Sequence, residues 1–234
     1  MSAPRSALLL GPPIRNNGGM TYPDRWERQP AHFVAALGIA VIAGELVPSA
    51  SPLFYATLGL AFLHQLWVAV WWRLELHGNV ISTRIGHPRG FTIYKVGFVA
   101  WAFVRVASVW WLAFQEPSGL GLAEPVRLGL AGLCLVLFAA LMISVRLTFG
   151  IERAFGLDHW DPDACREMGF VRRGLHKLTP NAMYVFAPTV LLVPALYTDS
   201  LTATVAALAN WAILWAHYWC TEKPDIARIW GEQA

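Results

Sequence analysis

Two polar segments in the C-terminal part of the chain carry side chains that could do chemistry. They are GLHKLTPNAMY (residues 174–184) and HYWCTEK (residues 217–223). Imidazole, amide, phenol and carboxylate groups can bind a polar cofactor and transfer a proton. The candidates are His176, Asn181, Tyr184, His217, Tyr218 and Glu222. A structural interpretation stands beside this one, because Thr179-Pro180-Asn181 is an ordinary helix start, with Asn181 as N-cap, and Tyr and Trp are common at membrane interfaces.

The apolar runs between these segments must bring them together. One run covers about residues 181–197, the next about 201–220, and only TDS (198–200) joins them. A tight helical hairpin returns the chain to the face that it left. We therefore expect the two polar segments to be neighbours at one membrane surface, although they lie far apart in the sequence.

The composition indicates a membrane protein. Of the 234 residues, 56% are hydrophobic and 14% are charged, and the mean hydropathy is +0.45. A soluble domain has roughly 25% charged residues, so the deficit favours a chain whose exterior faces lipid. The 12 Trp residues suit interfacial anchoring as well as packing. The formal charge of +3 is small, and nothing in the charge distribution suggests a nucleic-acid partner.

Six apolar segments approach the ~20 residues that cross a bilayer. They cover about residues 33–48, 52–72, 91–115, 126–148, 181–197 and 201–220. Basic residues cluster before the first segment and after the second, fourth and sixth, whereas the loops PSAS, QEPSGLGLAEP and TDS hold no Lys or Arg. By the positive-inside rule, this pattern predicts six spans with both termini in the cytoplasm.

We therefore predict an all-α fold, a polytopic membrane helical bundle of about six transmembrane helices that ends in a helical hairpin. Residues 1–31 form an N-terminal cytoplasmic or interfacial arm, residues 32–148 a four-helix transmembrane region, and residues 149–234 a loop, the hairpin and a C-terminal cytoplasmic segment. The expected location is a membrane, and specifically a bacterial inner membrane.

The stretch FVRRGLHKLTPNAMY (170–184) resembles a motif of the integral-membrane methyltransferases. These are the isoprenylcysteine carboxyl methyltransferases and the phosphatidylethanolamine N-methyltransferases. On their pattern, Gly174 takes the place of the glycine, His176 that of the tyrosine after it, and Tyr184 that of the closing tyrosine. Their second motif, a glutamate pair followed by an apolar helix that ends in Phe-Gly or Tyr-Gly, is similar to Thr221-Glu222 and Ile229-Trp230-Gly231. The resemblance covers about residues 150–234.

The resemblance implies a methyltransferase that uses S-adenosylmethionine (SAM), bound in a cytoplasmic pocket between the two motifs. SAM carries an ammonium and a sulfonium, so a partly desolvated Glu222 would favour its binding. Methyl transfer is an in-line displacement that depends on alignment and on exclusion of water. The implied cofactor-binding residues are Met168, Gly169, Phe170, Val171, Gly174, His176, Asn181, Tyr184 and Glu222. The implied catalytic residues are Tyr218, His217 and Asn181, and no metal is implied.

The implied acceptor is lipidic and arrives from the bilayer. A lipid amine, as in phosphatidylethanolamine, leads, and a thiol or another small hydrophobic acceptor comes next. The chain departs from the family where Pro180-Asn181-Ala182 replaces Arg-His-Pro, and where Glu222 alone replaces the glutamate pair. Tyr218 occupies the position of an arginine that holds the substrate carboxylate in the carboxyl methyltransferases, which argues against a prenylcysteine carboxylate.

Two alternatives of a different class stay open. Membrane sterol reductases have a related fold and bind NADPH, and Arg228-Ile229-Trp230-Gly231 is a weak echo of their C-terminal signature. The second alternative is a non-catalytic membrane scaffold that kept the fold after losing Arg-His-Pro. Binding of SAM, binding of NADPH, or binding of neither separates the three.

Other polar residues are interpreted as structural. We expect Arg105, inside the third apolar segment, to snorkel or to pair with a carboxylate such as Glu45 or Glu116. We expect His64 to form a hydrogen bond within the bundle, with a part in the acceptor tunnel as the alternative. GHPRGF (86–91) is predicted to be a turn. LDHWDPDAC (157–165) is predicted to be a solvated loop or a lid over the cofactor pocket. The spacing of Cys134, Cys165 and Cys220 predicts neither a disulfide nor a structural metal site.

Overall fold

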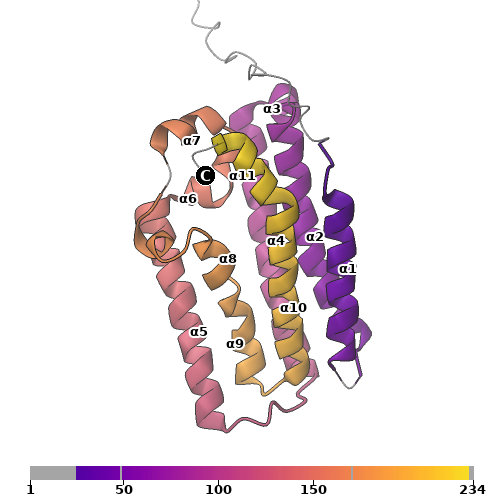
Figure 1. Ribbon diagram of the computed structural model, residues 1–234. Coiled ribbons are helices and arrows are strands. Elements are labelled where there is room, and N and C mark those ends of the chain that lie inside the picture. Colours follow the sequence, from indigo (N-terminus) through magenta and orange to yellow (C-terminus); the bar gives the residue numbers. More distant parts are fainter. Residues whose placement is uncertain (1–24, 48, 170, 232–234) are drawn as a thin grey trace, which may run out of the picture.

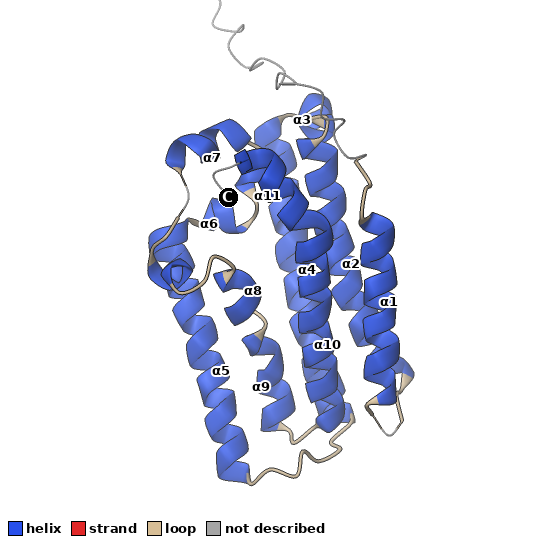
Figure 2. Cartoon of the chain, in the orientation of Figure 1, coloured by secondary structure: helices blue, strands red, loops and turns tan. Residues whose placement is uncertain are grey.

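A computed structural model of the chain shows a bundle of long, nearly parallel helices (Figure 1). It describes residues 25–47, 49–169 and 171–231, and these contain helices, turns and loops but no strand (Figure 2). Three helices are long and apolar enough to cross a membrane: Pro52–Leu76, His87–Gln115 and Glu124–Phe149. The expected all-helical fold is confirmed, and these three helices indicate a membrane protein. The predicted N-terminal arm lies almost wholly outside the described residues.

Five long helices build the bundle, and shorter elements connect them. The long helices are α1 (Gln29–Glu45), α2 (Pro52–Leu76), α4 (His87–Gln115), α5 (Glu124–Ser144) and α10 (Leu201–His217). The short helices are α3 (Val80–Ile85), α6 (Ile151–Ala154), α7 (Pro162–Met168), α8 (Ala182–Phe186), α9 (Thr189–Tyr197) and α11 (Lys223–Trp230). The 3₁₀ turns are η2 (Leu157–His159) and η3 (Gly174–Lys177), and the π-helical turns are η1 (Val145–Phe149) and η4 (Tyr218–Glu222).

The two ends of the bundle differ in complexity. The short helices α3, α6, α7 and α11 gather at one end, at the top of Figure 1, which we call the α11 end. The opposite end carries only connecting segments, among them residues 116–123 and 198–200. Helix α10 packs against α1, α2, α4 and α9, and α5 packs against α9. This arrangement leaves α10 as the central helix, with both polar segments of interest at the α11 end.

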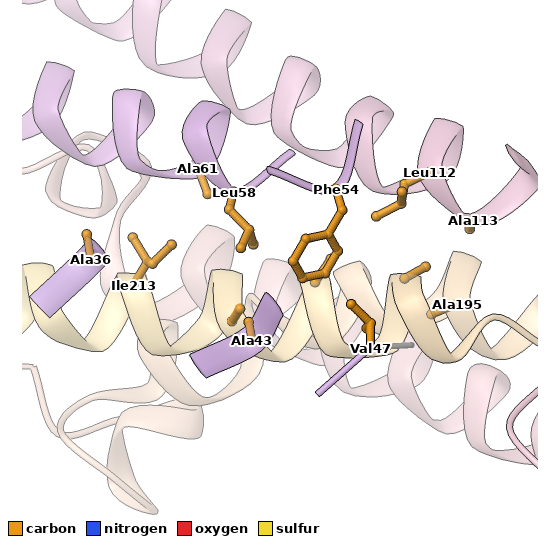
Figure 3. Packing of buried hydrophobic residues seen from close by; sticks show 13 residues of the cluster. Ala36, Ala43, Val47, Phe54, Leu58, Ala61, Leu112, Ala113, Ala195 and Ile213 are labelled. Carbon is orange, nitrogen blue, oxygen red and sulfur yellow. The ribbon is translucent and has the colours of Figure 1, made fainter. Parts of the chain in front are cut away.

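Small side chains form much of the core between α1, α2, α4 and α10. Figure 3 shows Phe54 and Leu58 of α2 directed toward alanines and short aliphatic residues of the neighbouring helices. Small residues let helix backbones approach closely, which gains dispersion contacts where lipid removes most of the hydrophobic driving force. The cluster comprises Ala36, Ala43, Val47, Phe54, Leu58, Ala61, Leu112, Ala113, Ala195, Ala203, Ala206, Ala209 and Ile213.

The fifth apolar segment forms two helices instead of one. Helix α8 ends at Phe186 and α9 begins at Thr189, with Pro188 between them. Proline lacks an amide hydrogen and interrupts the helical hydrogen bonds. The Thr189 hydroxyl lies 2.7 Å from the carbonyl oxygen of Phe186 and 3.1 Å from that of Cys134. A hydroxyl in this position satisfies carbonyl groups that the break leaves free, which is how an apolar bundle tolerates such breaks.

The prediction of a turn at residues 86–91 is wrong. Gly86 is the N-cap of α4, and the helix begins at His87. Proline is tolerated in a first helical turn, because the amide hydrogens there have no helical acceptor, and Pro88 occupies such a position. Gly90 packs so closely that an added Cβ would lie 2.8 Å from Ile81 and 3.0 Å from Trp160. The glycine therefore serves helix packing instead of a turn.

The prediction that Arg105 pairs with a carboxylate is also wrong. The Arg105 Nε donates to the side-chain oxygen of Asn210 at 2.9 Å, and its Nη2 donates to the Asn210 carbonyl at 2.8 Å. Glu45 is exposed, and Glu116 accepts a hydrogen bond from the Ser51 hydroxyl. The buried guanidinium of α4 is thus held by neutral oxygens of α10.

The expected hydrogen bond of His64 within the bundle is not formed either. Both of its ring nitrogens lack a hydrogen-bond partner among the described residues, and its ring centroid lies 4.8 Å from that of Phe98. The three cysteines Cys134, Cys165 and Cys220 are free thiols.

Candidate functional site

The start of α8 and the end of α10 meet at the α11 end of the bundle. The Tyr184 hydroxyl donates a hydrogen bond to Oε2 of Glu222. The Trp211 indole N–H donates to the Tyr184 carbonyl at 2.7 Å, and the rings of Tyr184 and Tyr218 lie 5.1 Å apart. Three of the predicted site residues, Tyr184, Tyr218 and Glu222, therefore come together as the hairpin requires.

Glu222 is a half-buried carboxyl group without a basic partner in an ion pair. None of the ion pairs among the described residues involves it. Burial raises the pKa of Glu222 to about 7, the hydrogen bond from Tyr184 acts in the opposite direction, and the charge of Asp158 raises the pKa further. A cationic ligand at this carboxylate would favour the ionised form and lower the pKa again. The pair is therefore suited to bind a positive charge.

The face that the end of α10 turns toward α8 decides which side chains join this pair. Residues four apart share one face of a helix, whereas adjacent residues point in different directions. Tyr218 and Glu222 contact α8, whereas the His217 ring lies 5.4 Å from that of His32 and 5.7 Å from that of Trp72. His217 is thus directed toward α1 and α2. The structure separates it from the Tyr184–Glu222 pair, with which the sequence had grouped it.

Asn181 and His176 lie on the approach to α8. Asn181 is the N-cap residue of α8, as predicted, but its side chain forms no capping hydrogen bond. The His176 ring stacks on Phe149 with 4.2 Å between centroids and 6° between planes. Burial, assisted by the charge of Arg153, lowers the pKa of His176. The His176 ring is thus used in packing, and the backbone N–H of Asn181 donates to the Thr179 hydroxyl at 3.2 Å, while its side-chain amide has no hydrogen bond to a described residue.

Gly174 has a structural reason to be glycine. Its φ is 59°, in the left-handed region, and an added Cβ would contact the hydroxyls of Ser144 and Thr148. The next amide, Leu175 N–H, donates to the Ser144 hydroxyl at 2.9 Å. The absence of a side chain therefore lets η3 pack against the end of α5.

The remaining predicted cofactor residues form the connection after α7. Met168 is exposed, Val171 is half-buried, and Phe170 lies outside the described residues. Gly169 has a φ of 72°, and its carbonyl accepts a hydrogen bond from Nη1 of Arg153 at 2.9 Å. The hydrogen bonds of the described residues do not connect this segment to Glu222.

A second polar cluster, which the sequence did not single out, lies nearby and is centred on Asp225. Its Oδ2 lies 3.3 Å from Nε of Arg73 and 3.4 Å from Nε2 of His159, and its Oδ1 lies 3.7 Å from Nε2 of His77. Nδ1 of His159 also lies 2.9 Å from Asp158. We call these five residues the Asp225 network. It connects α2, η2 and α11.

The charges of the Asp225 network neutralise one another. Burial raises the pKa of Asp225, but its close contacts with His159, His77 and Arg73 outweigh burial and hold the pKa at about 2. Burial lowers the pKa of His159, but Asp158 and Asp225 outweigh it and raise the pKa to about 10. The network is thus ionised and internally paired at neutral pH, in contrast to Glu222.

The network corrects two expectations. LDHWDPDAC is not a solvated loop throughout, because His159 is 2% exposed and stacks on Trp72 with 3.9 Å between centroids. Only its later part stays at the surface, where Asp163 pairs with Arg166 at 2.5 Å. Arg73, one of the basic residues that follow the second apolar segment, is 1% exposed and buried in the network.

Contacts with His77 of the Asp225 network, and with Arg166 and Arg153, hold helix α11 in place. Nη1 of Arg228 lies 3.1 Å from Nδ1 of His77, and Nε of Arg166 donates to the Ile229 carbonyl at 2.6 Å. The guanidinium of Arg153 lies 5.6 Å from the ring centroid of Trp230. The Arg228–Trp230 stretch, the weak echo of a reductase signature, makes packing contacts within the chain.

Comparisons with protein-family models, with curated proteins and with solved structures each found no match to this chain. The site is therefore assigned from the chemistry and the contacts of its own side chains. Within the described parts of the chain, no group of three or more His, Cys, Asp or Glu side chains is placed to hold a metal ion.

Sequence reasoning missed Asp225, Arg73 and His32. One signal was present for Asp225, since it precedes Ile229 by four residues and so shares the buried face of a short amphipathic helix. Arg73 and His77 have the same spacing at the end of α2. No comparable signal marked His32.

Proposed function

We propose that the protein is an integral-membrane, SAM-dependent methyltransferase that holds its cofactor at the Tyr184–Glu222 pair. The observation that carries the proposal is a half-buried carboxylate whose only hydrogen-bond partner among the described residues is a tyrosine hydroxyl. The ammonium or the sulfonium of SAM would supply the missing positive charge. The resemblance of residues 170–184 and 221–231 to the two motifs of this enzyme class supports the same assignment.

Each side chain near the pair has a part in this proposal. Glu222 binds the positive charge, and Tyr184 orients the carboxylate. Asn181, whose side-chain amide forms no capping hydrogen bond, contacts the cofactor at the start of α8. SAM supplies an activated methyl group, and the chain aligns it and excludes water, which accounts for much of the acceleration in a displacement of this kind. Tyr218 borders the reacting groups, because its ring contacts that of Tyr184.

The proposed acceptor is a membrane lipid, with the amine of phosphatidylethanolamine first and a thiol second. The apolar helices allow such an acceptor to arrive from the bilayer. We also propose six spans with both termini in the cytoplasm of a bacterium. The distribution of basic residues supports this orientation, because the exposed cations of the α11 end include Arg84, Arg89, Arg146, Arg172, Arg173 and Lys177.

Calorimetric titration of the purified protein with SAM tests the proposal. Glu222→Gln should weaken SAM binding by about 10- to 100-fold, since a hydrogen bond to a charged group is worth ~1.5–3 kcal/mol. Glu167→Gln, which removes an exposed carboxylate from α7, is the matched control and should bind SAM like the wild type.

Equal SAM affinity in the wild type and in Glu222→Gln would contradict the site. Titration with NADPH under the same conditions examines the reductase alternative. Binding of neither cofactor, together with no transfer of labelled methyl from SAM to a total lipid extract, would favour the non-catalytic scaffold.

A further inference from the structure

Two short turns at the α11 end, η1 and η3, pack against each other. Gly174 of η3 lies so close to α5 that an added Cβ would contact the Ser144 hydroxyl. The Leu175 N–H donates to the same hydroxyl at 2.9 Å, and the His176 ring stacks on Phe149 of η1. Residues that are 31 positions apart in the sequence thus meet here. The side chains that these two turns expose therefore share one surface.

Four cations and two leucines on these turns and beside them are exposed, and we call the six residues the η1–η3 surface. Leu147 is 75% exposed and Leu178 is 74% exposed, more than any other large apolar side chain among the described residues. Each leucine directly follows a basic residue in the sequence. The surface therefore combines positive charge with apolar tips, and its members are Arg146, Leu147, Arg172, Arg173, Lys177 and Leu178.

The protein does not neutralise the cations of the η1–η3 surface. Within the part of the chain that the structure describes, no ion pair involves any of the four. In the next two helices of the chain, Glu152 of α6 pairs with Lys95 at 2.8 Å, and Asp163 of α7 pairs with Arg166 at 2.5 Å. Of the acidic residues in α6 and α7, only Glu167 is left without an ion pair. The surface thus has an excess of positive charge.

An anionic phospholipid has the chemistry that this combination fits. A guanidinium donates two parallel hydrogen bonds to phosphate oxygens. Lys and Arg side chains near an anionic bilayer surface are attracted to it, and apolar side chains beside them enter the boundary between headgroups and acyl chains. A zwitterionic headgroup also contains a phosphate, but its own ammonium group is repelled by the cations of the surface. A lipid with a net negative charge is therefore favoured.

We propose that the η1–η3 surface binds anionic phospholipids of the leaflet at the α11 end. The four cations contact the phosphate groups, and Leu147 and Leu178 enter the apolar layer beneath them. This binding requires only a membrane location, which the three long apolar helices indicate. It is therefore independent of the methyltransferase activity, and either can be absent without the other.

Retention of lipids by the purified full chain tests the surface. The protein is reconstituted in vesicles of equal phosphatidylglycerol and phosphatidylcholine, recovered in mild detergent, and the retained lipids are measured by mass spectrometry. The wild type should retain phosphatidylglycerol over phosphatidylcholine by about fivefold or more, since one cation near an anionic bilayer surface contributes about that factor. The double variant Arg172→Gln/Arg173→Gln should reduce the ratio toward one. High salt should reduce the ratio of the wild type as well.

A matched control separates this surface from a general attraction of basic residues to the membrane. Arg84→Gln/Arg89→Gln removes the same number of exposed cations from α3 and α4 at the same end of the bundle, and it should keep the wild-type ratio. An equal fall of the ratio in both double variants, or a wild-type ratio of one, overturns the proposal. All four substituted side chains are exposed, so the variants should unfold at about the wild-type temperature.

Two further measurements distinguish a bound lipid from a bound phosphate ion. Leu147→Ser/Leu178→Ser should lower the amount of both retained lipids while their ratio stays that of the wild type, and an unchanged amount overturns the insertion of the leucines. Replacing chloride by inorganic phosphate at equal ionic strength should leave phosphatidylglycerol retention unchanged. A selective loss of phosphatidylglycerol in phosphate would show a site for a free anion and overturn the lipid surface.

Discussion

Tyr184 and Glu222, which are 38 positions apart, form a direct hydrogen bond between α8 and η4. The tyrosine is the donor, so the bond favours the ionised carboxylate and opposes the effect of burial on the Glu222 pKa. A single O–H group thus helps to set the pH range in which this site carries a negative charge.

SAM affinity should depend on pH with a midpoint set by Glu222. Its pKa is raised to about 7, so the carboxylate is protonated below that pH and ionised above it. A cation binds the ionised form, so affinity should fall about tenfold per pH unit below 7 and level off above 8. Calorimetry from pH 5.5 to 8.5 measures this profile. Glu222→Gln should flatten it, and an unchanged slope in that variant would remove Glu222 from cation binding.

Tyr184→Phe should shift the same profile to higher pH. The substitution removes only the hydroxyl that donates to Glu222, and that hydrogen bond lowers the Glu222 pKa. SAM should therefore bind more weakly at pH 7 and recover near the wild-type affinity at pH 9. An equal loss of affinity at all pH values would show that Tyr184 acts by packing or by direct contact with the ligand instead.

The Asp225 network should make thermal stability fall at high pH. The pKa of His159 is raised from its ordinary 6.5 to about 10, so its contribution is complete below pH 6.5 and is lost as pH rises through 10. The pKa of Asp225 is lowered from 3.8 to about 2, so its contribution is present above pH 3.8 and is lost as pH falls through 2. Apparent Tm at a fixed scan rate should drop by ~5 °C or more between pH 7 and 10.

His159→Gln provides the comparison for that measurement. Its Tm should be lower than the wild-type Tm at pH 7 but nearly constant up to pH 10, because the titrating group is absent. His87→Gln, outside the network, should keep the wild-type response. A wild-type Tm that stays constant up to pH 10 would show that His159 is not held as a cation.

Arg105 and Asn210 should show coupled effects on stability. Each of Arg105→Leu and Asn210→Leu breaks buried hydrogen bonds and should cost ~1–3 kcal/mol. The double variant should cost less than the sum by ~0.5–3 kcal/mol, since both single changes remove the same interaction. Arg105→Lys should rescue little, because an ammonium cannot reproduce the two-pronged contact. Additive losses in denaturant unfolding would show that the two side chains do not interact.

Gly174→Ala should destabilise the protein through its backbone. A side chain at a φ of 59° costs ~1–2 kcal/mol, and the new Cβ would also contact Ser144 and Thr148. Gly129→Ala in the middle of α5 is the control, because nothing lies within 4 Å of its added Cβ, and it should be neutral or stabilising. Equal Tm values for both variants would contradict the role of Gly174 in packing η3 on α5.

The sequence by itself determined the helical class, the apolar segments and the hairpin. These depend on local properties: run length, composition and the short TDS connection between two long apolar segments. Because a short connection forces two helices to lie antiparallel, the meeting of Tyr184 with Tyr218 and Glu222 was predictable before any coordinates. The predicted segments differ from the helices at their ends, where π-helical turns extend α5 and α10, and in the fifth segment, which is divided at Pro188 into α8 and α9.

Only the tertiary structure decided which polar side chains share a site. Packing decided which face of the end of α10 meets α8, and in the bundle His217 faces α1 and α2 while Tyr218 and Glu222 face α8. The partners of Arg73, Arg105 and Asp225 come from other helices, and no sequence interval encodes them. Burial decided the rest, because a carboxyl group that is an ordinary surface charge in water has a raised pKa when it is desolvated, as Glu222 does.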